Sequence, residues 1–538
     1  MNQNVVAHLS RFATEIPDQL AVKVPNRICN SLSYTNYNFQ SLDQLVDKAV
    51  TFLTNRAVVE KQRALVMIRP GLELIIMIFA LLKMGVVPVI IDPGIGRSRF
   101  LQCLQRSKPE ILLGIPWVIK LSYFFPKAFA GVHKRIPVGK HFISLLETLI
   151  PCTFSADPKP DQLAAILFTS GSTGFPKGVC YQHRHLYAQV EAIQKQYQIQ
   201  PGEIDLPMLP VFTLFNPLMG LTSIIPEINP RKPASLKPQY IVQAILENKV
   251  TNSFGAPVLW AKVADHCLKI TLILPSIRRI LMAGASAPIS LLDKLKTVCP
   301  NARVYTPYGA TEAMPVSSIS NTEINQEVQT LTHTGAGTCI GQVFPKISLK
   351  VVPLNHTFSL ENNSQIPECP VGEIGELLVA GSVVTESYDA LPEATSAAKI
   401  LTEGKLWHRM GDLGYRDQKN RIWFCGRKKE SFAIHSKRYF TDCCEAIANR
   451  WTGFSRSALI QYRDHNEQDF PAMVLEMNNE SNSRKKQNLV IEKLKPYLSQ
   501  FSATKDIEHF FFIKRFPVDV RHNTKIHRLA LSRKFSKS

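Results

Sequence analysis

Short apolar strands alternate with helices along most of this chain, and that alternation limits the folds open to it. Residues 63–69 and 86–92 have the pattern of strands on either side of an apolar helix at 72–85. A further strand at 163–170 precedes a helix at 183–198. Strand–helix–strand alternation predicts an α/β fold in which helices cover mainly parallel strands.

The pattern changes twice toward the C-terminus. Apolar segments at 347–353, 372–381 and 421–426 are separated by glycine and proline, which favours antiparallel pairing. After Gly426 a new series of helices and strands begins. Because 538 residues exceed one compact core, we predict two domains. We expect a large, multilayered N-terminal domain with mixed sheets at 1–426 and a small α+β C-terminal domain at 427–538, with a flexible surface loop at 478–487.

The formal net charge of +20 invites a nucleic-acid interpretation. The chain, however, has no zinc-finger spacing, no aromatic RNA-binding motif and no long block of lysine and arginine. A basic surface also attracts anionic small molecules or acidic lipid headgroups. We therefore expect no nucleic acid as the main partner.

The cysteines and the apolar segments indicate the cellular compartment in which the protein is expected. None of the eleven cysteines forms a C-x-x-C pair, which favours reduced thiols in a cytoplasmic protein. The first twenty residues lack the basic and apolar regions of a secretory signal. Glu73, Lys83 and Pro88 interrupt the most apolar stretch before it reaches membrane-spanning length. We expect no transmembrane segment, and peripheral membrane contact stays open.

Residues 167–178, "LFTSGSTGFPKG", have the composition of a phosphate-binding loop. Glycines let backbone N–H groups approach phosphate oxygens, hydroxyls add donors, and Lys177 adds a positive charge. A P-loop NTPase motif would place glycine before the lysine, but Pro176 stands there. The predicted phosphate-binding residues are Thr169, Ser170, Gly171, Ser172, Thr173, Gly174 and Lys177.

This loop resembles the signature loop of the adenylate-forming superfamily, which includes acyl-CoA synthetases, peptide-synthetase adenylation domains and luciferases. Those enzymes bind ATP, attack its α-phosphate with a carboxylate and release pyrophosphate. A second nucleophile then consumes the acyl-adenylate. The resemblance, which covers nearly the whole chain, implies ATP and Mg²⁺ as cofactors. It also implies a small C-terminal domain that rotates about a hinge, here Lys429.

Two further segments match the superfamily. Residues 305–313, "YTPYGATEA", are similar to its Y-G-x-T-E motif. The resemblance implies that Tyr308 stacks on adenine, that Thr311 contacts phosphate and that Glu312 is a ligand for Mg²⁺. Residues 281–288, "LMAGASAP", would offer backbone to the adenine. The nucleotide site implied in this way also includes Gly284, Ala285 and Gly309.

Two later motifs contain the residues expected to bind the ribose and to catalyse the reaction. In "HRMGDLGYRDQKNRIWFCGRKKE", the resemblance implies that Asp412 accepts hydrogen bonds from the ribose hydroxyls, with Arg427 nearby. The segment "FPVDVRHNTKIHRLAL" resembles the P-x-x-x-x-G-K-[IV]-x-R motif, with a threonine for the glycine. Its Lys525 is the expected catalytic residue, which bridges the substrate carboxylate and the α-phosphate. Thr169 and Glu312 complete the expected catalytic set.

The second half-reaction is less constrained. Ser436 and Ala433 replace a glycine and a lysine common in thioester-forming members, and a Cβ at 436 narrows a pantetheine passage. Stretches such as "PVIIDPGIG" and "VDVRHNTKI" look like the olefin-biosynthesis branch, whose β-lactone synthetases adenylate 2-alkyl-3-hydroxy fatty acids. The favoured substrate is therefore a long-chain 3-hydroxy acid. A fatty acyl-CoA ligase that uses coenzyme A, and a non-catalytic binding module, remain alternatives.

Overall fold

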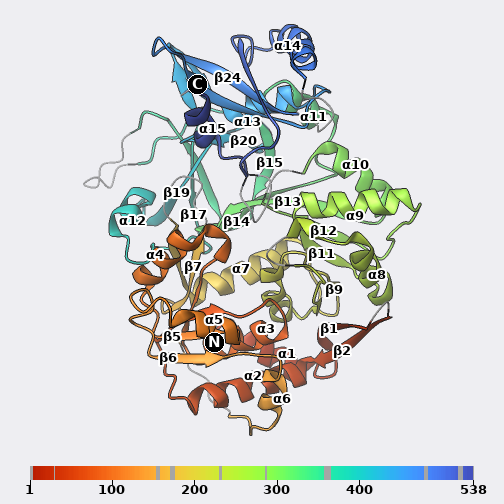
Figure 1. Cartoon of the computed structure of the whole chain (residues 1–538), viewed down its shortest axis with the longest axis vertical. Helices are drawn as coiled ribbons and strands as arrows, with labels where there is room; N and C mark the ends of the chain where they lie inside the picture. Colours follow the sequence, from red (N-terminus) through yellow and green to blue (C-terminus); the bar gives the residue numbers. More distant parts are fainter. Residues whose placement is uncertain are drawn as a thin grey trace.

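The computed structural model describes residues 4–28, 31–152, 158–169, 176–229, 233–284, 287–356, 365–477, 483–518 and 525–536. Figure 1 shows a large body that carries the N-terminus, with the last elements of the chain, coloured blue, gathered at the top. Helices lie against mixed sheets in the large body. The predicted α/β class, with a small α+β unit at the end, is confirmed.

The first sheet has six strands within the described residues, in the order β6–β5–β3–β4–β7–β8. All neighbours pair in parallel except β7 and β8, which are antiparallel. The strands are β3 Arg63–Met67, β4 Val87–Ile90, β5 Ile111–Gly114, β6 Lys134–Pro137, β7 Leu163–Thr169 and β8 Lys177–Gln182. Successive residues face opposite sides of this sheet, because Ala64 and Val66 join one apolar cluster and Leu65 joins another.

Helices cover both faces of the first sheet. The face of Ala64 and Val66 packs against α2 Phe39–Thr54, α3 Leu72–Lys83 and α6 Phe142–Glu147. The opposite face packs against α4 Arg97–Ser107 and α5 Pro116–Ser122. In α3, 10 of its residues are buried, as an apolar helix without a polar face requires. Its buried Lys83 pairs with Asp43 at 3.6 Å and with Asp47. No helix in the described ranges has the length and apolarity needed to span a bilayer.

The second sheet contains fourteen strands among the described residues, in the order β16–β17–β19–β20–β15–β14–β13–β12–β11–β9–β10–β1–β2, with β18 beside β19. The strands from β13 onward pair antiparallel, as the glycine and proline punctuation predicted. The bounds are β1 Leu20–Ile28, β2 Ser31–Asn38, β9 Ile204–Asp205, β10 Thr222–Ile224, β11 Asn252–Gly255, β12 Arg279–Met282, β13 Arg303–Ala310, β14 Ala313–Ser320, β15 Thr338–Val343, β16 Ser348–Val352, β17 Gly375–Ala380, β18 Lys399–Thr402, β19 Lys405–Arg416 and β20 Ile422–Arg427.

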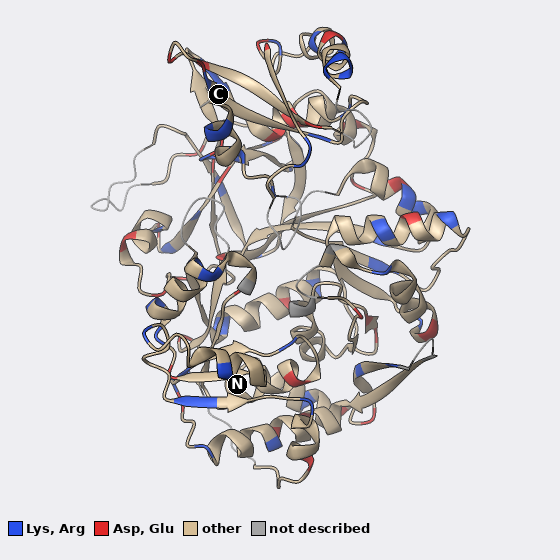
Figure 2. Ribbon diagram, in the orientation of Figure 1, with Lys and Arg blue, Asp and Glu red and all other residues tan. Residues whose placement is uncertain are grey.

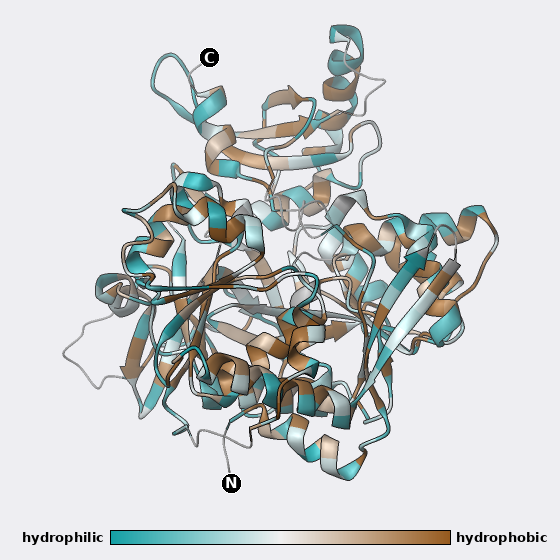
Figure 3. Cartoon of the chain, turned by 60° about the horizontal axis from the view of Figure 1, so that its bottom comes forward, coloured by the Kyte–Doolittle hydropathy of each residue, from teal (hydrophilic) through white to brown (hydrophobic). Residues whose placement is uncertain are grey.

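Further helices cover this sheet and connect its strands. They are α1 Ala7–Glu15, α7 His183–Gln196, α8 Pro238–Asn248, α9 Pro257–Lys269, α10 Ile289–Val298, α11 Gln326–His333 and α12 Pro392–Ala398. The helix predicted at 183–198 is therefore present as α7. Figure 3 shows hydrophobic segments, in brown, gathered toward the centre of the large body, as expected for helices packed on sheets.

The elements after Arg427 are β21 Phe432–Ile434, β22 Lys437–Tyr439, α13 Thr441–Ala448, β23 Arg456–Arg463, β24 Asp469–Glu476, α14 Arg484–Leu498, β25 His509–Ile513 and α15 Arg528–Phe535. Two apolar clusters are built wholly from this part of the chain. That supports a domain boundary at 427 and a hinge at Lys429, which both stay predictions. The loop predicted at 478–487 was wrong over its last residues, because Ser483 caps α14 and the helix starts at Arg484. Residues 478–482 lie outside the described residues.

Candidate active site

The glycine-rich loop joins two neighbouring strands of the first sheet. Thr169 ends β7, Lys177 begins β8, and these two residues are paired across the strands. The predicted strand before the loop is therefore present, but a second strand follows the loop, where a P-loop NTPase would have a helix. The predicted residues Ser170, Gly171, Ser172, Thr173 and Gly174 lie outside the described residues. At the exit, Arg106 of α4 donates to the Pro176 carbonyl at 3.4 Å.

Lys177 lies beside an aromatic ring and within electrostatic range of Glu312. Its ammonium is 4.4 Å from the centroid of the Tyr388 ring, a cation–π contact. Burial lowers the pKa of Lys177, and the Glu312 carboxylate acts in the opposite direction. Two of the predicted site residues, 135 positions apart, are thus brought together.

Glu312 occupies the turn between β13 and β14 and is held on two sides. The Tyr388 hydroxyl donates to its Oε1 at 2.9 Å. Its backbone carbonyl accepts from the Thr385 N–H at 2.9 Å and from the Thr385 hydroxyl at 3.1 Å. The Tyr181 hydroxyl donates to the carbonyl of Thr311, the other residue of the turn. The carboxylate is therefore positioned before any ligand binds.

Residues 384–389, here called the bridging segment, connect the two halves of this site. Val384 forms a bridge with Ala313, and Tyr388 forms one with Val179 of β8. The Asp389 N–H donates to the Gly178 carbonyl at 2.7 Å, and its carboxylate pairs with Arg63 at 3.0 Å. Sequence reasoning missed this segment, because its contacts join residues far apart in the chain.

A buried lysine lies behind the bridging segment. The Lys399 ammonium is 3.4 Å from the Thr385 hydroxyl, the same hydroxyl that contacts the Glu312 carbonyl. Burial lowers the pKa of Lys399 to about 7, and the charge of Glu312 raises it. No motif marks Lys399. A lysine after a short helix is usually a solvated residue, so burial was the missing signal.

Asp412 lies at the centre of the predicted ribose site. It is 2% exposed and sits on β19 directly opposite Arg427 of β20. Arg427 Nη1 lies 2.8 Å from Asp412 Oδ1, and the Tyr308 hydroxyl donates to Oδ2 at 2.5 Å. Burial raises the pKa of Asp412, whereas the charges of Arg427 and Lys525 lower it. Three predicted nucleotide-binding residues are therefore joined by one hydrogen bond and one ion pair, and Lys525 lies within electrostatic range.

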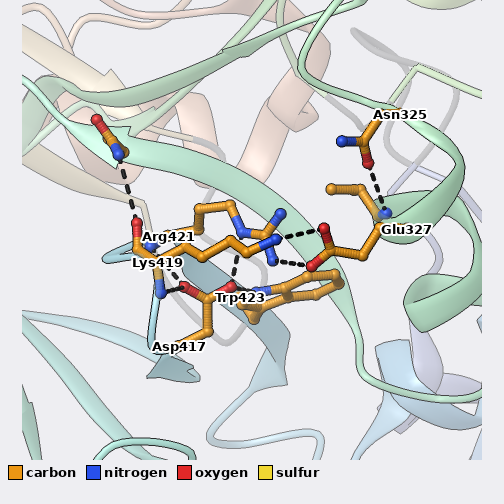
Figure 4. Close-up of polar contacts among 8 residues, drawn as sticks. Asn325, Glu327, Asp417, Lys419, Arg421 and Trp423 are labelled. Atoms are coloured by element: carbon orange, nitrogen blue, oxygen red, sulfur yellow. Dashed lines mark hydrogen bonds and ion pairs between the residues drawn. The ribbon is translucent and has the colours of Figure 1, made fainter.

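The other end of the β19–β20 hairpin is fixed by a charged network, drawn in Figure 4. Arg421 pairs with Asp417 at 2.7 Å and with Glu327 of α11 at 2.9 Å. The Trp423 indole N–H also donates to Asp417, at 2.9 Å. Because both strands are fixed here, the register that places Asp412 opposite Arg427 is maintained.

Lys525 lies just before α15, and the first residue of this helix, Arg528, anchors the helix. The Arg528 guanidinium pairs with Glu445 at 2.6 Å and with Glu430 at 2.9 Å. These ion pairs give a structural reason for the arginine three residues after the lysine in the motif. Thr524, which replaces the superfamily glycine, lies outside the described residues.

Glycine is needed at two of the predicted positions for different structural reasons. Gly284 follows β12 and has a φ of +93°, which L side chains rarely adopt. At Gly309 a Cβ would lie 2.9 Å from the Ala313 carbonyl, so the β13–β14 hairpin itself needs a glycine there. Ala285 lies outside the described residues.

Two features bear on the second half-reaction. Ser436 is exposed in the turn between β21 and β22, where the positive φ of +52° belongs to His435. In the large body the Phe212 and Phe254 rings stack with centroids 3.4 Å apart. The apolar stretches at 212–225 and 253–260 are therefore in contact.

Comparisons with known proteins show which family the chain belongs to. The family described as AMP-binding enzyme matches residues 13–389. The chain is 36% identical to the olefin beta-lactone synthetase of Stenotrophomonas maltophilia, over 98% of this chain and 97% of that protein. It is 35% identical to the olefin beta-lactone synthetase of Xanthomonas campestris pv. campestris, with the same coverage. Its fold is similar to the ATP-bound crystal structure of MatB from Rhodopseudomonas palustris, with a TM-score of 0.80 at 18% identity, covering 100% of this chain and 99% of that one.

Proposed function

Since this chain belongs to the AMP-binding enzyme family and is an AMP-forming ligase or synthetase, we propose that it activates a long-chain 3-hydroxy fatty acid and converts it to a β-lactone. The observation that carries the first step is the convergence of Lys177, Glu312, Asp412 and Lys525 on one site. An acyl-adenylate is the product that such a site favours.

In the proposed first step, a substrate carboxylate oxygen attacks the α-phosphorus of ATP and pyrophosphate leaves. Lys177 and the glycine-rich loop hold the departing phosphates. Asp412, fixed by Arg427, accepts hydrogen bonds from the ribose hydroxyls. Lys525 stabilises the negative charge that develops between carboxylate and α-phosphate.

Glu312 is the residue that would hold Mg²⁺. No cluster of three potential ligand side chains occurs among the described residues, so the ion would be held by one carboxylate together with phosphate oxygens. Mg²⁺ commonly binds in this way, and it would neutralise phosphate charge there. The hydroxyl of Tyr388 keeps one oxygen of Glu312 oriented.

Replacement of Tyr388 by phenylalanine tests this arrangement. The variant keeps the ring beneath Lys177 but loses the hydroxyl that donates to Glu312. We expect the Mg²⁺ concentration for half-maximal pyrophosphate release to rise about tenfold, the usual effect of removing a group that orients a metal ligand. Tyr240→Phe on α8 is the matched control. An unchanged Mg²⁺ requirement in the Tyr388 variant would contradict the proposed role of Glu312.

In the proposed second step, the 3-hydroxyl oxygen of the same acyl chain attacks the acyl carbon. The bond from that carbon to the phosphate oxygen breaks, AMP leaves, and the hydroxyl proton passes to solvent. Nucleophile and electrophile belong to one molecule, so proximity favours ring closure without a second substrate. The similarity to two olefin beta-lactone synthetases and the serine at 436 support this route.

Four assays distinguish β-lactone formation from acyl-CoA ligation. A 3-hydroxy fatty acid and the unsubstituted acid of equal length are each supplied with and without coenzyme A, and AMP release is measured. We expect AMP release to require the 3-hydroxyl group and to be independent of coenzyme A. Release that requires coenzyme A would instead identify an acyl-CoA ligase. Acid-dependent exchange of pyrophosphate into ATP measures the first step in every assay.

A further inference from the structure

Helix α5 and the turn after it carry an exposed aromatic surface that the nucleotide site does not use. Trp117, Tyr123 and Phe124 are 47%, 64% and 77% exposed, and Leu121 is 41% exposed. We call these four residues the aromatic patch. Within the described ranges, they include every large aromatic side chain that is exposed to this extent. A cluster of this kind on a soluble domain surface marks an interaction site.

Arginines hold the rings around the patch in place. The Arg135 guanidinium lies 4.6 Å from the centroid of the Tyr123 ring, and its Nε donates to the Ser122 hydroxyl at 3.0 Å. Arg97 of α4 lies 4.6 Å from the centroid of the Phe125 ring. One ring of the patch, Tyr123, and the neighbouring Phe125 ring therefore each lie against a guanidinium.

The chain segment that carries the patch has charged side chains of a single sign. Between Glu110 and Glu147 the chain contains five lysines and arginines and no aspartate or glutamate. Lys120 and Lys127 of this stretch are exposed between and beside the aromatic residues. Figure 2 shows basic residues in blue on α5 and β6. Anionic headgroups complement such a surface, and lysine stems can lie along apolar surface while their ammonium groups reach the headgroups.

The patch belongs to the helical layer that also contacts the phosphate loop. Helices α4 and α5 share one apolar cluster on the same face of the first sheet. From α4, Arg106 donates to the carbonyl of Pro176, directly after the glycine-rich loop. A surface docked through α5 would thus lie on the same part of the molecule as the nucleotide site.

We propose that the aromatic patch docks this protein on the surface of an anionic lipid bilayer. Tryptophan and tyrosine favour the headgroup region, where their rings meet apolar chains and their polar atoms meet water. Basic charge of one sign adds electrostatic attraction, and the two contributions together give stable peripheral binding. The docking itself does not depend on the proposed reaction. If that reaction is correct, docking brings the enzyme to where long-chain acids partition.

Flotation with lipid vesicles tests the proposal on the full chain. We expect binding to vesicles of equal parts phosphatidylcholine and phosphatidylglycerol, weaker binding to phosphatidylcholine alone, and release by salt. Joint replacement Lys120→Gln and Lys127→Gln should weaken binding about thirtyfold. Tyr123→Ser with Phe124→Ser should weaken it about tenfold or more.

Two control variants remove side chains of the same kinds from surfaces outside the aromatic patch. Lys269→Gln with Lys296→Gln removes two exposed charges from α9 and α10. Ile150→Ser with Leu401→Ser removes two apolar side chains that are 84% and 76% exposed. Both should bind as the wild type does, because neither pair lies on the patch. Pyrophosphate exchange in every variant verifies that the chain is folded.

Trp117 provides an independent readout. Trp260, Trp407 and Trp423 are buried, and Trp451 is partly buried in an apolar cluster of the C-terminal part. A blue shift of tryptophan emission on adding anionic vesicles should therefore come mainly from Trp117. Trp117→Phe should remove that shift. The proposal is wrong if the wild type ignores anionic vesicles or if the patch variants bind as strongly as the wild type. Self-association that the patch variants lose, without vesicle binding, would instead identify a protein interface. Either result leaves the proposed reaction untouched if exchange persists.

Discussion

Replacement of Lys525 by alanine is expected to lower acid-dependent pyrophosphate release by about 10²–10³-fold while ATP still binds. The charge of Lys525 lowers the pKa of Asp412, so Lys525 lies within electrostatic range of the proposed ribose site. The lost interaction belongs to the transition state, because the lysine stabilises charge that develops as the carboxylate attacks. The loss should therefore fall on kcat more than on the dissociation constant of ATP.

The measurement is pyrophosphate release with saturating ATP, combined with calorimetric titration of ATP. Lys514→Ala is a suitable control, because it removes an exposed lysine from the same C-terminal part. Wild-type rates of adenylation by the Lys525 variant would exclude this lysine from catalysis. Loss of ATP affinity in equal proportion would assign it to substrate binding.

Replacement of Arg528 by methionine is expected to destabilise the C-terminal part by about 3–5 kcal/mol. The buried carboxylates of Glu430 and Glu445 would lose their shared guanidinium, at 2.9 Å and 2.6 Å. Burial already raises the pKa of Glu430 against the effect of Arg528. Without Arg528, the pKa of Glu430 would rise further, because burial favours its protonated form. The folded state then binds more protons than the unfolded state, so the deficit should shrink as the pH falls.

Denaturant unfolding at several pH values measures this effect. Arg463→Met is the matched control, because Arg463 is 56% exposed and pairs with Asp469 at the surface. Its loss should cost about 1 kcal/mol or less. Equal losses for the two variants would contradict the anchoring role of Arg528. Because α15 follows Lys525 directly, the Arg528 variant should also lose adenylation activity at temperatures where it stays folded.

The parts of the site that could be predicted from the sequence are those whose residues lie within one short motif. The strand before the glycine-rich loop and the lysine after it follow from local composition. Glu312 and Asp412 could be proposed as site residues because each stands in a short recognisable segment. The pairing of Asp412 with Arg427 is also local, since these residues face each other across one hairpin.

The residues that hold Glu312 in position could not be predicted in the same way. Tyr388 contacts Glu312 across 76 positions, and nothing in its own neighbourhood marks a donor to a carboxylate. Lys399 differs from a surface lysine only through burial, which depends on the packing of distant strands. The first residues of α14, 484–487, were assigned to a loop because a polar, basic stretch has the composition of a loop, whereas the serine cap sets the start of the helix.

The bridging segment has a consequence for the order of events in catalysis. Its hydrogen bonds join it to β8 of one sheet and to the Glu312 turn of the other, so a few residues of backbone act as a spacer between Lys177 and Glu312. That spacing is set entirely within the large body. If the C-terminal part rotates about Lys429 as proposed, Lys525 would move toward the substrate or away from it while Lys177 and Glu312 keep their spacing. In the proposed mechanism, the nucleotide can therefore stay bound while Lys525 leaves the site.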